Sequence, residues 1–441
     1  MDSHANFDCG SRLPPSSRYL CAECPPTMIP IFILQTWLLG FLSLGILGGA
    51  VYLAHEWLQR SWVWDPVRQL SVFAPNFGSN QETMLFTIVL LLALIALAGG
   101  TIVKVILRLT RRTKPEDGID PRISPKPVSQ QRLRRTDGSD LHVEFYGPED
   151  GILIVLTHGW GLHGGEWNYL KREFAGDFRL IVWDEPGLGD STRPTSRDYS
   201  IENLARSLEA VLALAGDKPA ILLGHSIGGM IILTFCRLFP SALGSRVSGL
   251  VLSHTTPTNP VRTTSGSAFY TAIEKPILMP LMYLTIALSP LVWLMNWLSY
   301  LNGSAHVMNK LSSFGGTETW EQIDFATKFQ PQASPAVLAR GMLGMMRYDA
   351  TKTLAAISVP TLVVAGDRDS TTKPEASERI RASVPGARLI TLTPAKHLGL
   401  IEHHERYAQA VREFAYATQT QTKEVSAAGQ TQDAKIPARI E

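Results

Sequence analysis

One short motif in the sequence has the residue types and spacing of an activated nucleophile. Ser226 lies in the segment GHSIG (residues 224–228), after an apolar run at Ala220–Leu223 and before a stretch typical of a helix. A serine in a tight strand-to-helix turn is lifted above the edge of the sheet, and the two flanking glycines leave room for neighbouring chain. The motif therefore predicts a nucleophilic serine at residue 226.

A nucleophilic serine needs a base and a carboxylate, and both follow later in the chain. Asp369 comes just after a predicted strand at Thr361–Ala365, and His397 comes just after one at Arg388–Leu392. The carboxyl ends of parallel strands meet at one edge of a sheet, where ligands bind. We therefore expect His397 to take the serine proton and Asp369 to orient the imidazole. Asp367 is the competing acid, but it lies nearer the strand, where a turn-capping role is expected.

Acyl transfer also requires two backbone N–H groups for the negative charge that develops on the substrate oxygen. One is expected from Ile227, which follows the nucleophile. The other is expected from Trp160, in the segment HGWG (residues 158–161) directly after the apolar run Ile152–Thr157. A tight turn with no catalytic part is the alternative for this second segment.

Two groups of residues could in principle hold a metal ion. His158 and His163 have no partners at the spacing of known metal motifs, so a loop-stabilising role is expected for them. In the N-terminal tail, no second well-spaced pair supports a zinc site formed by His4, Cys9, Cys21 and Cys24. We predict neither a metal nor an organic cofactor, and a reduced, disordered tail over residues 1–28.

The elements that must position these residues alternate between short apolar runs and helical stretches. This alternation predicts a doubly wound, mostly parallel sheet flanked by helices. The predicted strands that follow a hairpin near residue 137 are Ile152–Thr157, Arg179–Trp183, Ala220–Leu223, Gly249–Leu252, Thr361–Ala365 and Arg388–Leu392.

From about Arg132 to Tyr416 the chain resembles the α/β-hydrolase fold superfamily. The resemblance rests on HGWG, DEPGLGDS (residues 184–191), GHSIGG, GDRD (366–369) and KHLGLIEHHERY (396–407). It implies an α/β-hydrolase fold and a place near monoacylglycerol lipases, esterases and cofactor-free haloperoxidases. Haloalkane dehalogenases and epoxide hydrolases of this fold carry an aspartate at the position of the nucleophile, in the turn between strand and helix (the nucleophile elbow). Ser226 at this position therefore argues against both classes of enzyme.

The N-terminal quarter of the chain differs in composition from the rest. Two stretches with few charges, at about residues 29–54 and 84–109, are long enough to cross a bilayer as helices. Buried core helices, or a cleaved signal peptide for the first stretch, are the alternatives. Lys104 to Arg135 holds ten Lys and Arg against three Asp and Glu. By the positive-inside rule, a hairpin with both termini and the catalytic domain in the cytoplasm is expected.

The remaining boundaries follow from composition. We expect a basic, proline-rich linker at 110–131, a hydrolase core at 132–256 and 351–418, a cap at 257–350, and a disordered tail at 419–441. The cap contains a charge-free run, Pro276–Asn309. A third crossing there would separate Ser226 from Asp369 and His397, so we expect short helices broken by its prolines.

Together these patterns predict a membrane-anchored serine hydrolase that cleaves carboxylic esters of apolar, lipid-like molecules through an acyl-serine. Its expected partners are such an ester and the bilayer, and the net charge of +2 gives no reason to expect nucleic acid. The alternatives are a haloperoxidase-like perhydrolase or a C–C bond hydrolase with the same residues, or a catalytically silent membrane scaffold.

Overall fold

The computed structural model describes residues 29–109 and 119–433. The predicted tail 1–28 with its three cysteines, residues 110–118 of the linker, and the last eight residues lie outside the described residues.

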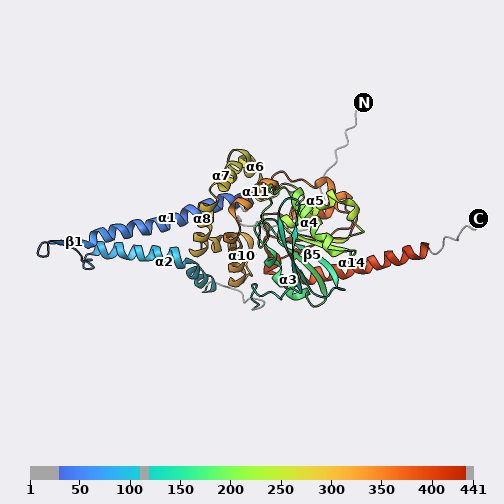
Figure 1. Ribbon diagram of the computed structural model, residues 1–441, viewed down its shortest axis with the longest axis horizontal. Helices are drawn as coiled ribbons and strands as arrows, with labels where there is room; N and C mark the ends of the chain where they lie inside the picture. Colours follow the sequence, from blue (N-terminus) through green and yellow to red (C-terminus); the bar gives the residue numbers. More distant parts are fainter. Residues whose placement is uncertain (1–28, 110–118, 434–441) are drawn as a thin grey trace, which may run out of the picture.

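Two long helices form a hairpin that projects from the rest of the molecule (Figure 1). Helix α1 (Ile29–Ser61) and helix α2 (Asn80–Leu109) are joined through a small antiparallel pair, β1 (Trp62–Asp65) and β2 (Leu70–Phe73). Both helices are long and apolar enough to cross a membrane, with mean hydropathies of 1.8 and 2.6. They extend beyond the predicted bounds of 29–54 and 84–109, toward the β1–β2 turn.

A mixed sheet of eight strands forms the centre of the core predicted at 132–256 and 351–418. Its order is β10-β9-β8-β7-β5-β6-β4-β3; β4 runs antiparallel to both of its neighbours, and every other adjacent pair is parallel. The strands are β3 (Ser129–Arg134), β4 (Asp140–Tyr146), β5 (Ile152–Thr157), β6 (Phe178–Trp183), β7 (Ala220–His225), β8 (Val247–Ser253), β9 (Thr361–Gly366) and β10 (Arg388–Leu392). All six predicted parallel strands are present, and β3 begins three residues before the predicted start of the core.

Helices cover both faces of the sheet because successive side chains of each strand point to opposite sides. Leu153 and Val155 of β5 belong to one apolar core, with α4 (Ile201–Leu212), α5 (Ile227–Leu238) and α12 (Pro374–Ser383). Ile154 and Leu156 belong to the other core, with α3 (Asn168–Phe174) and α14 (His404–Asp433). The short helix α13 (Gly399–Glu402) precedes α14.

Helix α14 continues to Asp433, whereas we expected a disordered tail from residue 419. No proline interrupts the sequence between His404 and Asp433, and this stretch is rich in Ala, Gln and Glu, which favour helix. Composition that suggested a polar tail is therefore equally compatible with a solvated helix.

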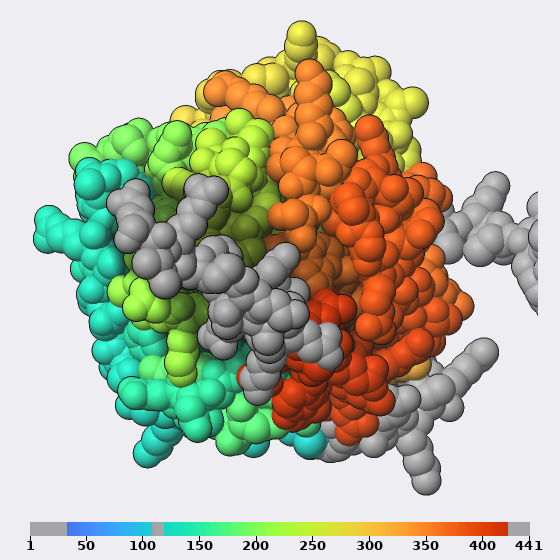
Figure 2. All heavy atoms as spheres, turned by 90° about the vertical axis from the view of Figure 1, so that its right-hand side faces the viewer, coloured from blue at the N-terminus to red at the C-terminus, as the bar shows by residue number. Residues whose placement is uncertain are grey.

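Viewed from the end opposite the hairpin, the sheet and its flanking helices hide most of the hairpin, and the yellow cap segment stands out at the top (Figure 2).

The cap lies between β8 and β9, within the predicted bounds. Its helices are α6 (Ser267–Ile273), α7 (Met279–Ala287), α8 (Ser289–Leu301), α9 (Ser304–Ser313), α10 (Trp320–Gln332) and α11 (Pro335–Met345). The chain bends by 96° between the helical stretches Ser267–Ala287 and Ser289–Leu301. Pro290 lies in the first turn of α8, where a proline costs no intrahelical hydrogen bond. Pro276 and Pro280 instead lie inside the helical stretch Ser267–Ala287, in and just after a π-helical turn at Glu274–Leu278. The predicted break of the charge-free run is therefore confirmed before Pro290, but not at Pro276 or Pro280.

The first half of α1 packs against this cap. The indole N–H of Trp37 donates a hydrogen bond to Oγ1 of Thr285 in α7 at 2.9 Å. Nearer the middle of α1, Oγ of Ser43 accepts from Nδ2 of Asn302 at 2.7 Å and lies 3.0 Å from Oγ of Ser299 in α8. The hairpin is therefore held to the cap at one end, and the remainder of α1 projects away from it (Figure 1).

Candidate active site

The turn between β7 and α5 holds Ser226 in an unusual backbone conformation. Its φ and ψ are 54° and −116°, a region that costs a non-glycine residue about 1–3 kcal/mol. A Cβ on Gly224 would lie 2.4 Å from the carbonyl carbon of Gly228, and a Cβ on Gly228 would lie 2.3 Å from the carbonyl oxygen of Thr157. The glycine spacing of the motif is thus required by close approaches of the chain on both sides of the serine.

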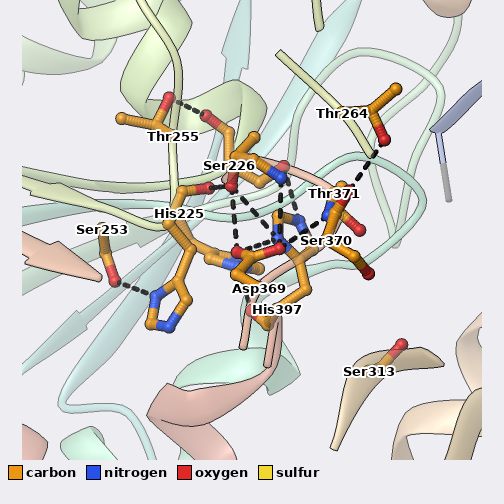
Figure 3. Close-up of polar contacts among 12 residues, drawn as sticks. His225, Ser226, Ser253, Thr255, Thr264, Ser313, Asp369, Ser370, Thr371 and His397 are labelled. Carbon is orange, nitrogen blue, oxygen red and sulfur yellow. Dashed lines mark hydrogen bonds and ion pairs between the residues drawn. The ribbon is translucent and has the colours of Figure 1, made fainter. Parts of the chain in front are cut away.

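The structure brings the three predicted side chains together in a hydrogen-bonded series (Figure 3). Nε2 of His397 lies 3.0 Å from Oγ of Ser226, and Nδ1 of His397 lies 2.9 Å from Oδ2 of Asp369. Ser226 follows β7, Asp369 follows β9 and His397 follows β10. The three residues therefore meet at the carboxyl edge of the sheet, in the geometry that lets an imidazole accept a hydroxyl proton.

The carboxylate of Asp369 is buried and fully occupied by donors. Its Oδ1 accepts from the backbone N–H groups of Thr371 at 2.8 Å and Thr372 at 3.1 Å, and its Oδ2 accepts from Oγ1 of Thr372 at 3.0 Å. Burial acts to raise the pKa of Asp369, but the charge and hydrogen bond of His397 outweigh it and hold this pKa below its ordinary value. The group is therefore an anion that favours a positive charge on His397.

The competing acid, Asp367, has a different place. Its Oδ1 accepts from the backbone N–H of Ala395 at 2.8 Å, which ties the loop after β9 to the loop after β10. The structure places Asp369, and not Asp367, against His397.

The two predicted oxyanion donors belong to the turn that carries the nucleophile and to the loop after β5. Ile227 is the first residue of α5, so its N–H has no partner within the helix. Trp160 lies in the loop after β5 and lines the same cavity as Ser226. Its indole N–H donates to the carbonyl of Leu338 in α11 at 3.0 Å, so the loop is fastened to the cap.

A buried ion pair supports this loop, and we did not predict it from the sequence. Oε1 of Glu166 lies 2.5 Å from Nδ1 of His225, the residue before the nucleophile. Oε2 of Glu166 accepts from the N–H of Gly159 at 2.8 Å, and Nε2 of His225 contacts the carbonyl of His397 at 3.0 Å. Burial acts to lower the pKa of His225, but the charge and hydrogen bond of Glu166 raise it above its ordinary value. The sequence did offer one indication of this pair, because Glu166 is a carboxylate in a loop that otherwise consists mostly of glycines and apolar residues.

The other histidines near the first loop have structural partners. Nε2 of His158 accepts from the N–H of Glu185 at 2.9 Å, and Nδ1 of His163 accepts from the N–H of Gly165 at 3.1 Å. Both contacts agree with the expected loop-stabilising role. Within residues 29–109 and 119–433, no group of three or more His, Cys, Asp or Glu side chains is arranged to hold a metal ion.

Ser226 and His397 open onto a cavity of about 180 Å³. One water takes at least roughly 10–15 Å³ of such a cavity, so there is room for about a dozen waters or a ligand of similar size. Its walls come from the loop after β5, from α9, α10 and α11 of the cap, and from α1. The apolar side chains that line it are Leu39, Trp160, Leu162, Ala305, Met308, Ala326, Phe329, Leu338, Met342, Met345 and Leu398.

Comparison with known proteins places this arrangement in a family. The model of the "Alpha/beta hydrolase family" matches residues 154–410, which is more than half of the chain. The chain belongs to the α/β-hydrolase family. This membership agrees with the strand order, the elbow and the predicted fold class, an α/β-hydrolase fold with a helical cap.

The similar members of the family include several esterases. The pimeloyl-[acyl-carrier protein] methyl ester esterase of Xanthomonas axonopodis pv. citri is 26% identical over 288 residues, covering 62% of this chain and 98% of that protein. The corresponding enzyme of Xanthomonas campestris pv. campestris is 27% identical over 281 residues, covering 63% of this chain and 99% of its own length. More than a third of this hydrolase thus has no counterpart in either relative.

Two solved structures of esterases also superpose on about two thirds of this chain. A thermophilic esterase from Thermogutta terrifontis is 26% identical and superposes with a TM-score of 0.54, covering 66% of this chain and 99% of that protein. An esterase from a Rhodococcus species, 23% identical with a TM-score of 0.54, shares the fold and likewise covers 66% of this chain.

Proposed function

We propose that this hydrolase is a membrane-anchored serine esterase that cleaves carboxylic esters of apolar, lipid-like molecules. The observation that carries the proposal is the hydrogen-bonded series Ser226–His397–Asp369 at a cavity lined mostly by apolar side chains. The esterase activity named for the relatives at 26–27% identity supports the same reaction class.

The proposed reaction uses only groups of this chain and water. Oγ of Ser226 attacks the ester carbon while Nε2 of His397 takes its proton, and His397 returns this proton to the departing alcohol. Water, deprotonated by the same imidazole, then attacks the acyl-serine and releases the acid. Asp369 holds the imidazole in the required tautomer and stabilises its positive charge, which its lowered pKa favours.

The charge on the substrate oxygen is assigned to the N–H groups of Ile227 and Trp160. An N–H group at the start of a helix carries partial positive charge and, without an intrahelical partner, needs no reorganisation to bind an oxyanion. Loss of one such donor typically lowers kcat by about 10²–10³-fold.

The hairpin supports the membrane part of the proposal. Two helices of sufficient length and hydropathy precede the hydrolase core, and ten Lys and Arg against three Asp and Glu lie from Lys104 to Arg135, at the end of the second helix and after it. By the positive-inside rule, we place both termini and the hydrolase core on the cytoplasmic side, with the β1–β2 turn on the opposite side. A tethered enzyme with a mostly apolar cavity is suited to substrates that partition into the bilayer.

Turnover of esters of graded chain length tests the proposal. We expect the detergent-solubilised protein to hydrolyse p-nitrophenyl esters, with medium and long acyl chains preferred over acetate. Ser226→Ala should lower kcat at least about a thousandfold. Ser245→Ala, which removes a hydroxyl bonded to the carbonyl of Ser241 on the surface, is the matched control and should leave the rate unchanged. Retention of activity in Ser226→Ala, or activity confined to acetate, would contradict the proposal.

A further inference from the structure

Two polar side chains of α1 are buried at the active-site cavity without a partner. Gln35 and Thr36 are 8% and 4% exposed, and both line the cavity that holds Ser226 and His397. Neither Oε1 of Gln35 nor Oγ1 of Thr36 has a hydrogen-bond partner. Leaving such a group buried and unpaired costs roughly 1–3 kcal/mol, so each one requires an explanation.

Three other polar side chains of the cavity wall, on α9 and α10, do have partners. Asn309 donates to Oγ1 of Thr327 at 3.1 Å, and Thr327 donates to the carbonyl of Ile323 at 2.7 Å. Gln330 donates to Oδ1 of Asn296 at 3.4 Å. Among the described residues of the cavity wall, the other buried side-chain atom without a hydrogen-bond partner is Nδ1 of His225, which faces the carboxylate of Glu166; Oε1 of Gln35 and Oγ1 of Thr36 face no such charge.

Two other buried hydroxyl groups, in α1 and α7, donate to a backbone carbonyl of their own helix. Ser43 in α1 donates to the carbonyl of Leu39 at 2.6 Å, and Thr285 in α7 donates to the carbonyl of Leu281 at 2.8 Å. Both hydroxyls use the preceding helical turn, as serine and threonine commonly do within helices. The hydroxyl of Thr36 does not do so.

We propose that Gln35 and Thr36 form a polar subsite, here the α1 subsite, that binds a hydroxyl group of the ester substrate. The proposal rests on the ester hydrolysis proposed above and narrows its substrate class. A hydroxyl group both donates and accepts, so it can pair with the amide of Gln35 in either orientation and with the hydroxyl of Thr36. In the described part of the chain, no Lys, Arg, Asp or Glu side chain lines this cavity, which disfavours a charged group.

The α1 subsite gives the hairpin a second role. Helix α1 supplies part of the cavity wall through Gln35, Thr36 and Leu39, and the same helix continues into the stretch that is apolar enough to cross a bilayer. Substrate binding and membrane anchoring thus depend on one helix.

Paired substrates that differ by one hydroxyl test the α1 subsite. One pair is ethylene glycol monodecanoate and propyl decanoate, which places the hydroxyl in the alcohol part. The other is methyl ω-hydroxydecanoate and methyl undecanoate, which places it on the acyl chain. The proteins compared are the full-length wild type, the double variant Gln35→Leu/Thr36→Val, and Leu38→Ala, which alters an exposed position of α1.

We expect the wild type to prefer the hydroxylated ester in one of the two pairs. In the double variant this preference should fall about tenfold, the worth of a hydrogen bond, with kcat/KM for the hydroxyl-free ester changed less than about twofold. Leu38→Ala should keep the wild-type preference. The α1 subsite would be overturned if the wild type showed no preference in either pair. It would also be overturned if the double variant lost kcat/KM equally for the hydroxylated and the hydroxyl-free ester.

Two further readouts separate the possible failures. Fluorophosphonate labelling of Ser226 in wild type and double variant tests the proposed hydrolase chemistry itself, so labelling without a hydroxyl preference refutes the α1 subsite alone. The double variant should unfold at the same or a higher temperature than the wild type, because it replaces unpaired buried polar atoms with apolar groups of similar shape. A lower unfolding temperature would show that these side chains serve the fold and would contradict the subsite.

Discussion

The carboxylate of Glu166 lies 2.5 Å from the imidazole of His225, and both side chains are buried. Glu166 also accepts the N–H of Gly159, next to Trp160, while His225 contacts the carbonyl of His397. This single ion pair therefore connects the loop after β5, the nucleophile turn and the loop that carries the proposed base. We infer that Glu166 is a positioning residue for the proposed oxyanion donors.

Glu166→Gln should lower kcat about tenfold while KM changes less than twofold. The variant loses the negative charge that faces His225, so the loop that carries the N–H of Trp160 is held less firmly at the moment the oxyanion forms. Steady-state kinetics on one p-nitrophenyl ester checks this. Glu202→Gln, which removes a solvent-exposed ion pair with Arg237, is the control and should retain both constants. An unchanged kcat in Glu166→Gln would refute the positioning role.

Ser226→Gly should be inactive and yet more stable than Ser226→Ala, by about 1 kcal/mol. The φ of 54° at this position is unfavourable for any residue with a Cβ and readily adopted by glycine. Part of that gain is offset because glycine is also freer in the unfolded chain. Thermal unfolding of the two inactive variants in the same detergent measures the difference. Equal stabilities would show that the turn stores no strain at the nucleophile.

Glu185→Gln should make stability less dependent on pH. Burial, with Glu166 nearby, raises the pKa of Glu185 well above its ordinary value of 4.5, so the folded protein holds a proton that the unfolded chain releases. Stability is then complete below pH 4.5 and falls by up to about 1.4 kcal/mol per pH unit as the pH rises toward the folded-state pKa. Unfolding temperatures at pH 4.5 and pH 8 should therefore differ less in Glu185→Gln than in wild type. An identical pH dependence in the two proteins would contradict a neutral Glu185.

A cysteine at the β1–β2 turn should be labelled from the side opposite the hydrolase core. Val67 is 91% exposed in that turn, and Ser245 lies on the surface of the hydrolase core. With the N-terminal cysteines replaced by serine, an impermeant maleimide should label Val67→Cys in right-side-out vesicles and Ser245→Cys in inverted vesicles. Labelling of both positions from the same side would refute the hairpin topology.

Much of the site was predictable because residues that directly follow parallel strands lie at the same edge of the sheet. Ser226, Asp369 and His397 each follow a buried apolar run, and parallel strands bring their carboxyl ends to one edge. The same reasoning separated Asp369 from Asp367, since the residue nearer the strand bonds the adjacent turn.

The contribution of α1 to the cavity could not be derived in this way. Its apolar composition predicts a span, but no local pattern says which side of a helix packs against a cap more than two hundred residues away, as Trp37 does against Thr285. Gln35 and Thr36 were visible only as two polar residues in an apolar stretch. The ion pair of Glu166 was missed for the same reason, since its partners come from separate loops.

Covalent labelling of the nucleophile tests the proposed chemistry most directly. A fluorophosphonate reacts with a serine only when a base has activated its hydroxyl, so tandem mass spectrometry should find the adduct on Ser226 of the full-length protein. His397→Ala should abolish the adduct, because Nε2 of His397 is the group within 3.0 Å of the hydroxyl. An adduct that forms equally in His397→Ala, or one found on a serine other than Ser226, would contradict the assignment of these residues to catalysis.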